Sequence, residues 1–308
     1  MENSVSLTIL GGLANVLMVL LVAPFCQGVL RKVTALIQSR QGPPIRQAYY
    51  DLLKLLGKED LESGDSPVMQ RFAVYMSLAT VLAISTLVPM GFSSPMNGQG
   101  DVILLIYLLT LSGICTLLAG LAAGSTYSIL GISRQMMIMI ALEPLFATAI
   151  IIGAIHTRSF RLDTVLHGSV YANQGFPWSG LIILIVMLLS FQAFVERVPF
   201  DISEAETELM EGPLVEYSGP KLAMFKYASM VKLIIYSALF VDIFAPWPTG
   251  IAGPIQWLLF WAKIFVLVLL VTLVAATHAR YRIDQAIRYF ALLLAAAVAA
   301  LVLAGFGL

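Results

Sequence analysis

The chain has 308 residues, of which 59% are hydrophobic and only 12% are charged, and its mean hydropathy is +0.89. A soluble globular domain carries roughly 25% charged residues, so this composition excludes a soluble domain of useful size and predicts a membrane protein almost throughout. The net charge of zero excludes a general electrostatic attraction to nucleic acid. We therefore expect a single integral membrane domain over residues 1–308.

Eight apolar stretches are long enough to cross a membrane, because a bilayer core requires about 20 residues of helix. Their residues do not alternate in polarity as those of a transmembrane β-barrel would. We therefore predict an all-α fold, a polytopic membrane helical bundle with about eight transmembrane helices. The fourth stretch is the weakest, because Glu143 and Pro144 interrupt its middle. The predicted spans cover roughly residues 6–29, 70–92, 102–123, 134–155, 178–196, 224–245, 254–277 and 287–307.

The first long loop, residues 30–69, is too polar to span a membrane. Its sequence YYDLLKLL has apolar residues at helical spacing with Asp51 and Lys54 opposite, which predicts a short amphipathic helix in the membrane interface. Two interpretations stay open: a connector folded over the bundle, or a docking surface for a cytoplasmic partner that includes Arg46, Asp51 and Lys54. The apolar residues of this helix are Tyr49, Leu52, Leu53 and Leu56.

The second long loop, residues 197–223, belongs to the stretch ERVPFDISEAETELMEGPLVEYSG, which holds over a third of the chain's 18 acidic residues. Apolar and turn residues are interleaved with the acids, which indicates a segment that folds back against the bundle. The alternative is a solvated acidic face, the usual meaning of a charge run. The seven acids are Glu196, Asp201, Glu204, Glu206, Glu208, Glu211 and Glu216.

A short helix is predicted within this acidic stretch, because Ser203 and Glu206 have the spacing of a capping box and Gly212 would end the helix. Neighbouring carboxylates about 6 Å apart repel by roughly 2–3 kcal/mol at an effective dielectric constant near 20. At least one of them should therefore hold a proton near pH 7 and exchange it with a neighbour. The acids expected on one face are Glu204, Glu208 and Glu211, with Asp201 one turn earlier.

Four ionisable residues fall inside the predicted spans: Glu143, Lys232, Asp242 and Lys263. A charge at the bilayer centre costs at least about 2.5–3.5 kcal/mol, so such residues pair with one another or line an internal path. One interpretation is a structural ion pair between Glu143 and Lys232 or Lys263. The other is a proton relay from the acidic loop into the bundle, which Pro144 favours because it frees a backbone carbonyl where water can bind.

Lysine and arginine are distributed unequally among the predicted loops. Fourteen of them lie in or beside the odd-numbered loops, whereas the even-numbered loops hold only Arg158 and Arg161. The positive-inside rule therefore predicts a multi-pass protein of a prokaryotic cytoplasmic membrane, with both termini outside and the loops 30–69 and 197–223 in the cytoplasm. The first apolar run lacks the basic flank of a signal peptide, so we expect a retained helix.

The residues that could hold a metal ion are few and scattered. Cys26 and Cys115 lie in separate apolar runs, and the three histidines show no ligand spacing with them. We therefore expect no metal site and no iron–sulfur cluster in this chain.

Three loop motifs together resemble the proximal membrane subunit of respiratory complex I, the eight-helix subunit beside the quinone cavity. They are RKVTALIQSRQGPP...YYDLLKLLGKED, PFDISEAETELMEG...EYSG and ARYRIDQAIR, and they occur in the right order over most of the chain. The shortened first motif and EGPLVEYSG differ from quinone-linked members. Together with GLAAGSTYSILGISRQMM, they resemble the membrane subunit of energy-converting (group 4) nickel–iron hydrogenases, of the Ech and formate hydrogenlyase subunit 4 type.

The resemblance implies a membrane anchor without a catalytic residue or cofactor of its own. The nickel–iron centre and iron–sulfur clusters would lie in partners: the hydrogenase large and small subunits and a ferredoxin-like iron–sulfur subunit. Electrons from reduced ferredoxin or formate would reduce protons to hydrogen, and antiporter-like membrane subunits would move H⁺ or Na⁺. Arg40 and Arg197 would act at the mouth of an acidic channel. The expected proton-relay residues are Glu143, Glu196, Asp201, Glu204, Glu206, Glu208, Glu211, Glu216, Lys232 and Lys263.

Two alternative functions stay open. One is the membrane subunit of a quinone- or methanophenazine-linked oxidoreductase of the complex I type. The other is a stand-alone secondary transporter, which predicts inverted repeats that the sequence does not display. For the leading hypothesis, we expect Glu206→Gln or Glu143→Gln to uncouple ion transport while leaving the hydrogen chemistry of the partner subunit largely intact.

Overall fold

The computed structural model describes residues 2–61, 66–90, 100–166, 170, 177–247 and 253–307, with side chains described from residue 10 onward except that of Glu206. Over these ranges the chain is a bundle of α-helices, which confirms the predicted all-α fold.

Among the described residues, seven helices are long and apolar enough to cross a membrane. The remaining predicted span, residues 178–196, corresponds to α7 (Trp178–Phe194). Its 17 residues lie at the short limit of about 17–25 for a transmembrane helix. α1 and α5 extend well beyond the predicted spans, because polar residues continue their helices past the apolar runs. The seven long helices are α1 (Glu2–Ile37), α3 (Pro67–Leu87), α4 (Val102–Ala123), α5 (Thr126–Thr157), α9 (Gly219–Phe244), α10 (Gly253–Thr277) and α11 (Ile283–Gly305).

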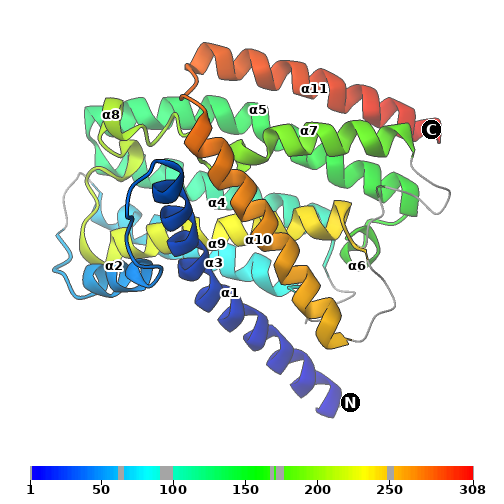
Figure 1. Cartoon of the computed structure of the whole chain (residues 1–308), viewed down its shortest axis with the longest axis horizontal. Helices are drawn as coiled ribbons and strands as arrows, with labels where there is room; N and C mark the ends of the chain where they lie inside the picture. The colour runs from blue at the N-terminus through cyan, green and yellow to red at the C-terminus, as the bar shows by residue number, and fades with distance from the viewer. Residues whose placement is uncertain are drawn as a thin grey trace.

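Short elements lie at both ends of the bundle. α2 (Gln47–Leu56) and α8 (Glu206–Leu209) lie at one end, which we call the mouth end, whereas α6 (Leu162–Val165) lies at the other (Figure 1). The two long loops meet at the mouth end, where Lys221 Nζ is 3.3 Å from a carboxylate oxygen of Asp60. Their predicted location on one side of the membrane is therefore consistent with the fold.

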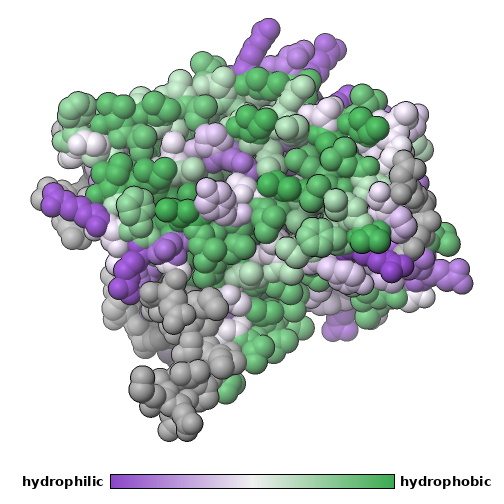
Figure 2. All heavy atoms as spheres, turned by 180° about the vertical axis from the view of Figure 1, so that it is seen from behind, coloured by the Kyte–Doolittle hydropathy of each residue, from purple (hydrophilic) through white to green (hydrophobic). Residues whose placement is uncertain are grey.

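The core of the bundle is built around α9. Helices α1, α2, α3 and α10 pack against it, while α11 covers α5 and α7, and most side chains of α9 are buried. The outer surface is strongly apolar: seen from behind, it is mostly hydrophobic, with hydrophilic residues mainly toward its margins (Figure 2). Large side chains such as Leu17, Leu121 and Val266 are more than half exposed, as expected where lipid replaces water.

The acidic stretch folds back against the bundle, as predicted. Phe200 packs against Tyr281, Tyr289 and Phe290 with ring centroids 5.0–5.4 Å apart. Further along, η2 (Gly212–Leu214) begins at Gly212, whose φ of +53° and approach to the Ser203 carbonyl leave no room for a Cβ atom. These contacts fix the position of the acids relative to the spans.

Candidate functional site

Two internal cavities meet in the middle of the molecule. One of about 60 Å³ lies among α4, α5, α7 and α9, and one of about 460 Å³ lies at the mouth end beside the acidic stretch. Glu196 and Lys232 line both cavities, and both spaces are large enough to hold water. This pair, which we call the junction, therefore lies where the mouth-end cavity and the inner cavity adjoin.

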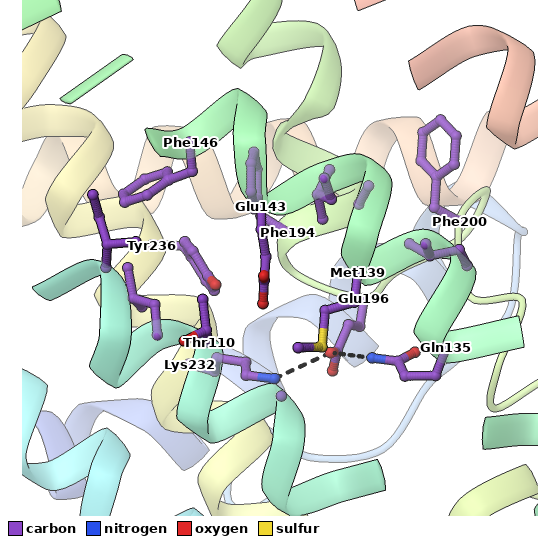
Figure 3. Close-up of a pocket in the computed structure, with 16 residues that line it drawn as sticks. Thr110, Gln135, Met139, Glu143, Phe146, Phe194, Glu196, Phe200, Lys232 and Tyr236 are labelled. Atoms are coloured by element: carbon purple, nitrogen blue, oxygen red, sulfur yellow. Dashed lines mark hydrogen bonds and ion pairs between the residues drawn. The ribbon is translucent and has the colours of Figure 1, made fainter. Parts of the chain in front are cut away.

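The junction is held by three side chains from three elements (Figure 3). Lys232 Nζ of α9 lies 3.1 Å from Glu196 Oε1, and Gln135 Nε2 of α5 donates a hydrogen bond of 3.0 Å to the same oxygen. The side chains of Lys232 and Glu196 are only 11% and 24% exposed, so each charge depends on the other. Glu196 has a φ of +55°, a left-handed conformation uncommon for glutamate, and it turns the chain away from α7.

Glu143 points into the inner cavity from the middle of α5, toward the side of the junction (Figure 3). Among the described residues, its carboxyl group makes no hydrogen bond and no ion pair. The interpretation of Glu143 as the ion-pair partner of Lys232 is therefore wrong, because the nearer carboxylate of Glu196 binds Lys232. Glu143 is half-buried and lies beside Pro144, which leaves a carbonyl one turn earlier without its helical donor.

Three further polar groups of this site were not predicted: Gln135, Thr110 and Tyr236 line the inner cavity with Glu143. Helical spacing would have indicated two of them. Gln135 precedes Glu143 by eight residues, and Tyr236 follows Lys232 by four, so each shares a helix face with a predicted residue. Thr110, on α4, carries no comparable signal.

Glu204 is the carboxyl group of the mouth-end cavity that has no ion-pair partner among the described residues. Burial, followed by the negative charges of Glu196 and Asp201, raises the pKa of Glu204 to about 8, against the opposing effect of Arg197 and Lys232. These surroundings therefore favour the protonated form of Glu204 more than those of an ordinary glutamate. This supports the expectation that at least one acid of the stretch holds a proton.

The predicted acidic helix is wrong in its extent. The observed helix α8 contains only Glu206–Leu209; Ala205 is its N-cap, and the described residues form no capping box there. Met210 and Glu211 both adopt left-handed backbone conformations, which end the helix before Gly212. Glu204, Glu208 and Glu211 therefore do not form a row on one helix face.

The acids at the edge of the stretch are paired with bases instead. Glu208 Oε2 is 2.7 Å from Arg134 Nη1, and this contact holds the pKa of Glu208 below its usual range. Glu211 Oε1 lies 3.3 Å from Lys226 Nζ. Both carboxylates are about half exposed, so for these two the alternative of a solvated, paired acidic face fits better.

The remaining predicted acids lie around the same mouth. Asp201 lines the mouth-end cavity, and its Oδ2 is 3.2 Å from Arg280 Nη2. Glu216 lies half-buried between η2 and α9 and lines neither cavity. Glu206 begins α8, but its side chain lies outside the described residues.

Helix α2 forms where the amphipathic helix was predicted, with some of its apolar side chains buried and others exposed. Leu52 is buried, and the Tyr49 hydroxyl donates to the Leu21 carbonyl of α1, whereas Leu53 is 65% exposed. Asp51 accepts from Arg31 at 2.6 Å, and Arg31 lowers the pKa of Asp51. Asp51 thus fixes α2 to α1.

The other candidate docking residues differ in their surroundings. Arg46 is exposed at the start of α2, and Lys54 lines a small mouth-end cavity with Arg31 and Lys226. Arg197 Nη2 donates to Gln27 at 2.6 Å, and burial lowers the pKa of Arg197 from its ordinary value. Arg40 is exposed and lines a third cavity with Arg197.

Lys263 is not part of this constellation. Its Nζ donates to the Ala245 carbonyl at 2.6 Å and to the Trp247 carbonyl, at the end of α9 that lies away from the mouth end. It lines neither the inner nor the mouth-end cavity. Lys263 therefore stabilises the C-terminus of α9, where a positive charge is favourable.

Within the described part of the chain, no three His, Cys, Asp or Glu side chains converge on a point that could hold a metal ion. Cys26 on α1 and Cys115 on α4 are both buried free thiols. These donor sets do not fit a nickel–iron centre or an iron–sulfur cluster.

Residues 11–305 match the family model described as NADH dehydrogenase. Formate hydrogenlyase subunit 4 of Escherichia coli is 32% identical over 290 residues, which are 90% of this chain and 92% of that protein. NADH-ubiquinone oxidoreductase chain 1 of Paracentrotus lividus is 33% identical over 90% of this chain and 88% of its own length.

Hydrogenase-4 component C of Escherichia coli is 33% identical over 76% of this chain and 74% of its own length. A chain of the membrane-bound sulfane sulfur reductase, an archaeal respiratory membrane complex, superposes with a TM-score of 0.87 at 25% identity and covers 96% of this chain and 99% of that one. These matches confirm the resemblance indicated by the loop motifs. The chain belongs to the NADH dehydrogenase family of membrane subunits, which includes both the hydrogenase and the complex I branches.

Proposed function

We propose that the chain is the membrane anchor and ion-coupling subunit of an energy-converting nickel–iron hydrogenase complex. The observation that supports this most is the similarity to Formate hydrogenlyase subunit 4, because it spans nearly the whole of both chains. The nickel–iron centre and the clusters would lie in the hydrogenase large and small subunits and in a ferredoxin-like subunit. Antiporter-like membrane subunits would lie beside it in the bilayer.

The orientation follows from the charges of the loops. The mouth end carries most of the Lys and Arg residues and faces the cytoplasm, so the redox partners dock there and both termini lie on the opposite side. The exposed helix α2 and the charged groups Arg46 and Lys54 contribute to this docking surface.

The proton path begins at the mouth-end cavity. Glu204, whose pKa is raised by burial, shares this cavity with the Glu196 carboxylate. Water in the cavity can carry a proton from Glu204 to Glu196. The two carboxyl groups repel when both are ionised, which favours one proton shared between them.

The junction then acts as an electrostatic gate. The Glu196 carboxylate attracts the Lys232 ammonium at 3.1 Å, and a proton on Glu196 removes that attraction. Lys232 also lines the inner cavity that contains Glu143. When Glu196 is neutral, the positive charge of Lys232 favours ionisation of Glu143. Glu143 therefore releases its proton before the next proton moves inward from Glu196.

Purification of the complex under mild detergent tests the assignment. The proposal predicts nickel in stoichiometric amounts and hydrogen production from reduced ferredoxin or formate. A complex that contains this chain but neither nickel nor hydrogen-evolving activity would refute it.

The complex I branch supports one alternative, a quinone- or methanophenazine-linked oxidoreductase subunit. The 33% identity with NADH-ubiquinone oxidoreductase chain 1 over 90% of this chain favours it. This alternative predicts that a quinone-site inhibitor stops electron flow in the purified complex. Insensitive electron flow together with hydrogen evolution would exclude it.

A further inference from the structure

A basic cavity of about 450 Å³ lies at the mouth end between the end of α1, the turn that follows it, and α10. Within the described part of the chain, its charged lining residues are Arg31, Arg40 and Arg197, and no carboxylate lines it. The mouth-end cavity beside the acidic stretch shares Arg31 and Arg197 with it, but four carboxylates also line that cavity. The basic cavity is therefore a place for an anion rather than for a proton.

Two of the three guanidinium groups have donors to spare. Arg40 is exposed and its side chain makes no hydrogen bond or ion pair with any described residue. Arg197 donates one hydrogen bond to Gln27 at 2.6 Å, which leaves further N–H groups of its five unused. Arg31 is compensated by Asp51 at 2.6 Å. A guanidinium fork matches the oxygens of a phosphate group in geometry and charge.

The position of the cavity along the membrane normal points to lipid. α1 has 36 residues, which gives about 54 Å of helix at 1.5 Å per residue, against a hydrocarbon core of about 30 Å. Its last turns, from Arg31 onward, therefore reach the headgroup layer. Leu36 and Ile37 at its end are 61% and 42% exposed, as expected for side chains that dip into an interface.

The cavity has both apolar and positively charged walls, which match the acyl chains and the phosphate group of a phospholipid. Leu30 and Ala35 of α1 face Val271 and Ala275 of α10 across the space, so apolar walls lie directly beside the guanidinium groups. A free phosphate ion would leave these walls uncovered. A glycerol and acyl chain would cover them, and both helices expose further apolar side chains, such as Leu21 of α1 and Leu273 of α10.

We propose that this cavity binds the phosphate group of an anionic phospholipid, with Arg40 and Arg197 as its ligands and the acyl region between α1 and α10. The site is independent of the proposed hydrogenase assignment, since it depends only on the fold and on the membrane. Bound lipid would also stabilise the contact between α1 and α10 beside the mouth-end cavity.

The test uses the whole purified complex in nanodiscs that contain phosphatidylglycerol and phosphatidylcholine in equal amounts. After delipidation to the tightest-bound molecules, native mass spectrometry counts the lipids retained. We expect retained phosphatidylglycerol in the native protein and about tenfold weaker retention in Arg40→Ala, since one charge-assisted contact is worth roughly a factor of ten or more. Arg288→Ala, which changes an exposed arginine of α11 outside the cavity, is the matched control and should retain the lipid.

A second variant, Ala275→Leu, fills part of the cavity but keeps all three arginines. It should also lose the lipid. Equal retention of phosphatidylglycerol in the native complex, Arg40→Ala and Ala275→Leu would overturn the proposal. So would equal retention of phosphatidylcholine, or displacement of the lipid by millimolar inorganic phosphate, which would indicate a site for a free anion. A native complex that retains no lipid at all would show that a partner subunit covers the cavity and would also overturn it.

Discussion

Two groups of carboxylates within one acidic stretch have opposite surroundings. Glu196 and Glu204 line the mouth-end cavity and are mostly buried, whereas Glu208 and Glu211 are about half exposed and paired with Arg134 and Lys226. The difference is also electrostatic. The pKa of Glu204 rises to about 8, whereas that of Glu208 is lowered.

The comparison shows that proximity in sequence does not decide which acids hold protons. Repulsion within a row of acids predicts a raised pKa, but for Glu204 burial is the larger cause and the neighbouring charges come second. Glu208, an exposed acid paired with Arg134, instead has a lowered pKa. A proton path therefore needs buried acids that share a cavity, and only part of the stretch meets this condition.

The largest effect is expected from Glu143→Gln, because an amide cannot take up and release the proton that the inner cavity must pass on. Ion translocation should fall by about tenfold or more, while hydrogen evolution by the partner subunit stays close to its native rate. Proton uptake by proteoliposomes and hydrogen production, measured on the same preparation, check this. Glu208→Gln is the matched control; unchanged translocation in Glu143→Gln would remove Glu143 from the path.

The next effect concerns the junction. Lys232→Met removes one partner of a mostly buried ion pair and leaves the Glu196 charge uncompensated, which should destabilise the fold by about 3–5 kcal/mol. The double variant Lys232→Met with Glu196→Gln removes both charges and should recover most of that loss. Thermal unfolding of the purified complex measures both. If the single variant unfolds at the native temperature, the pair contributes nothing.

A smaller effect is a pH dependence from Glu204. The folded protein holds a proton with a pKa of about 8, whereas an unfolded glutamate releases it near 4.3. The folded state thus binds more protons between these values, so the stabilisation from neutral Glu204 falls as the pH rises through this window. Infrared difference spectra should show a protonated carboxyl band lost near pH 8 and absent in Glu204→Gln; a band that survives in Glu204→Gln would assign the proton elsewhere.

The smallest effect is expected at the exposed edge. Breaking the Arg134–Glu208 pair by Glu208→Gln should change stability by less than about 1 kcal/mol, and less still at high salt, because water and ions screen it. Denaturant titrations at two salt concentrations measure this. A loss comparable to that of Lys232→Met would contradict the division between the two groups.

Much of the architecture was predictable because lipid imposes strict rules. Each predicted span corresponds to a helix, the amphipathic helix α2 forms, and the two long loops meet at one end. The helix boundaries were less accurate: α1 continues to Ile37 and α5 begins at Thr126. Hydropathy detects the apolar segment, whereas backbone hydrogen bonds let a helix continue into polar sequence.

The site was only partly predictable, because long-range contacts decide it. Ser203 and Glu206 satisfied the rule for a capping box, yet the helix begins only at Glu206. Long-range contacts, in which Gly212 packs on Ser203 and Phe200 packs in an aromatic cluster, hold the preceding residues. One interpretation paired Glu143 with Lys232 or Lys263, whereas Lys232 pairs with Glu196. No local pattern reports which of two carboxylates a distant helix brings closer.

The central claim is that the mostly buried acids Glu143, Glu196 and Glu204 carry the translocated protons, whereas Glu208 and Glu211, which are about half exposed and paired with bases, do not. The most direct test is the ratio of protons translocated to hydrogen produced, measured in proteoliposomes for single Gln variants of Glu143, Glu196, Glu204, Glu208 and Glu211. The account predicts a ratio near zero for the first three and the native ratio for the last two. Native ratios for Glu143, Glu196 and Glu204 would contradict it.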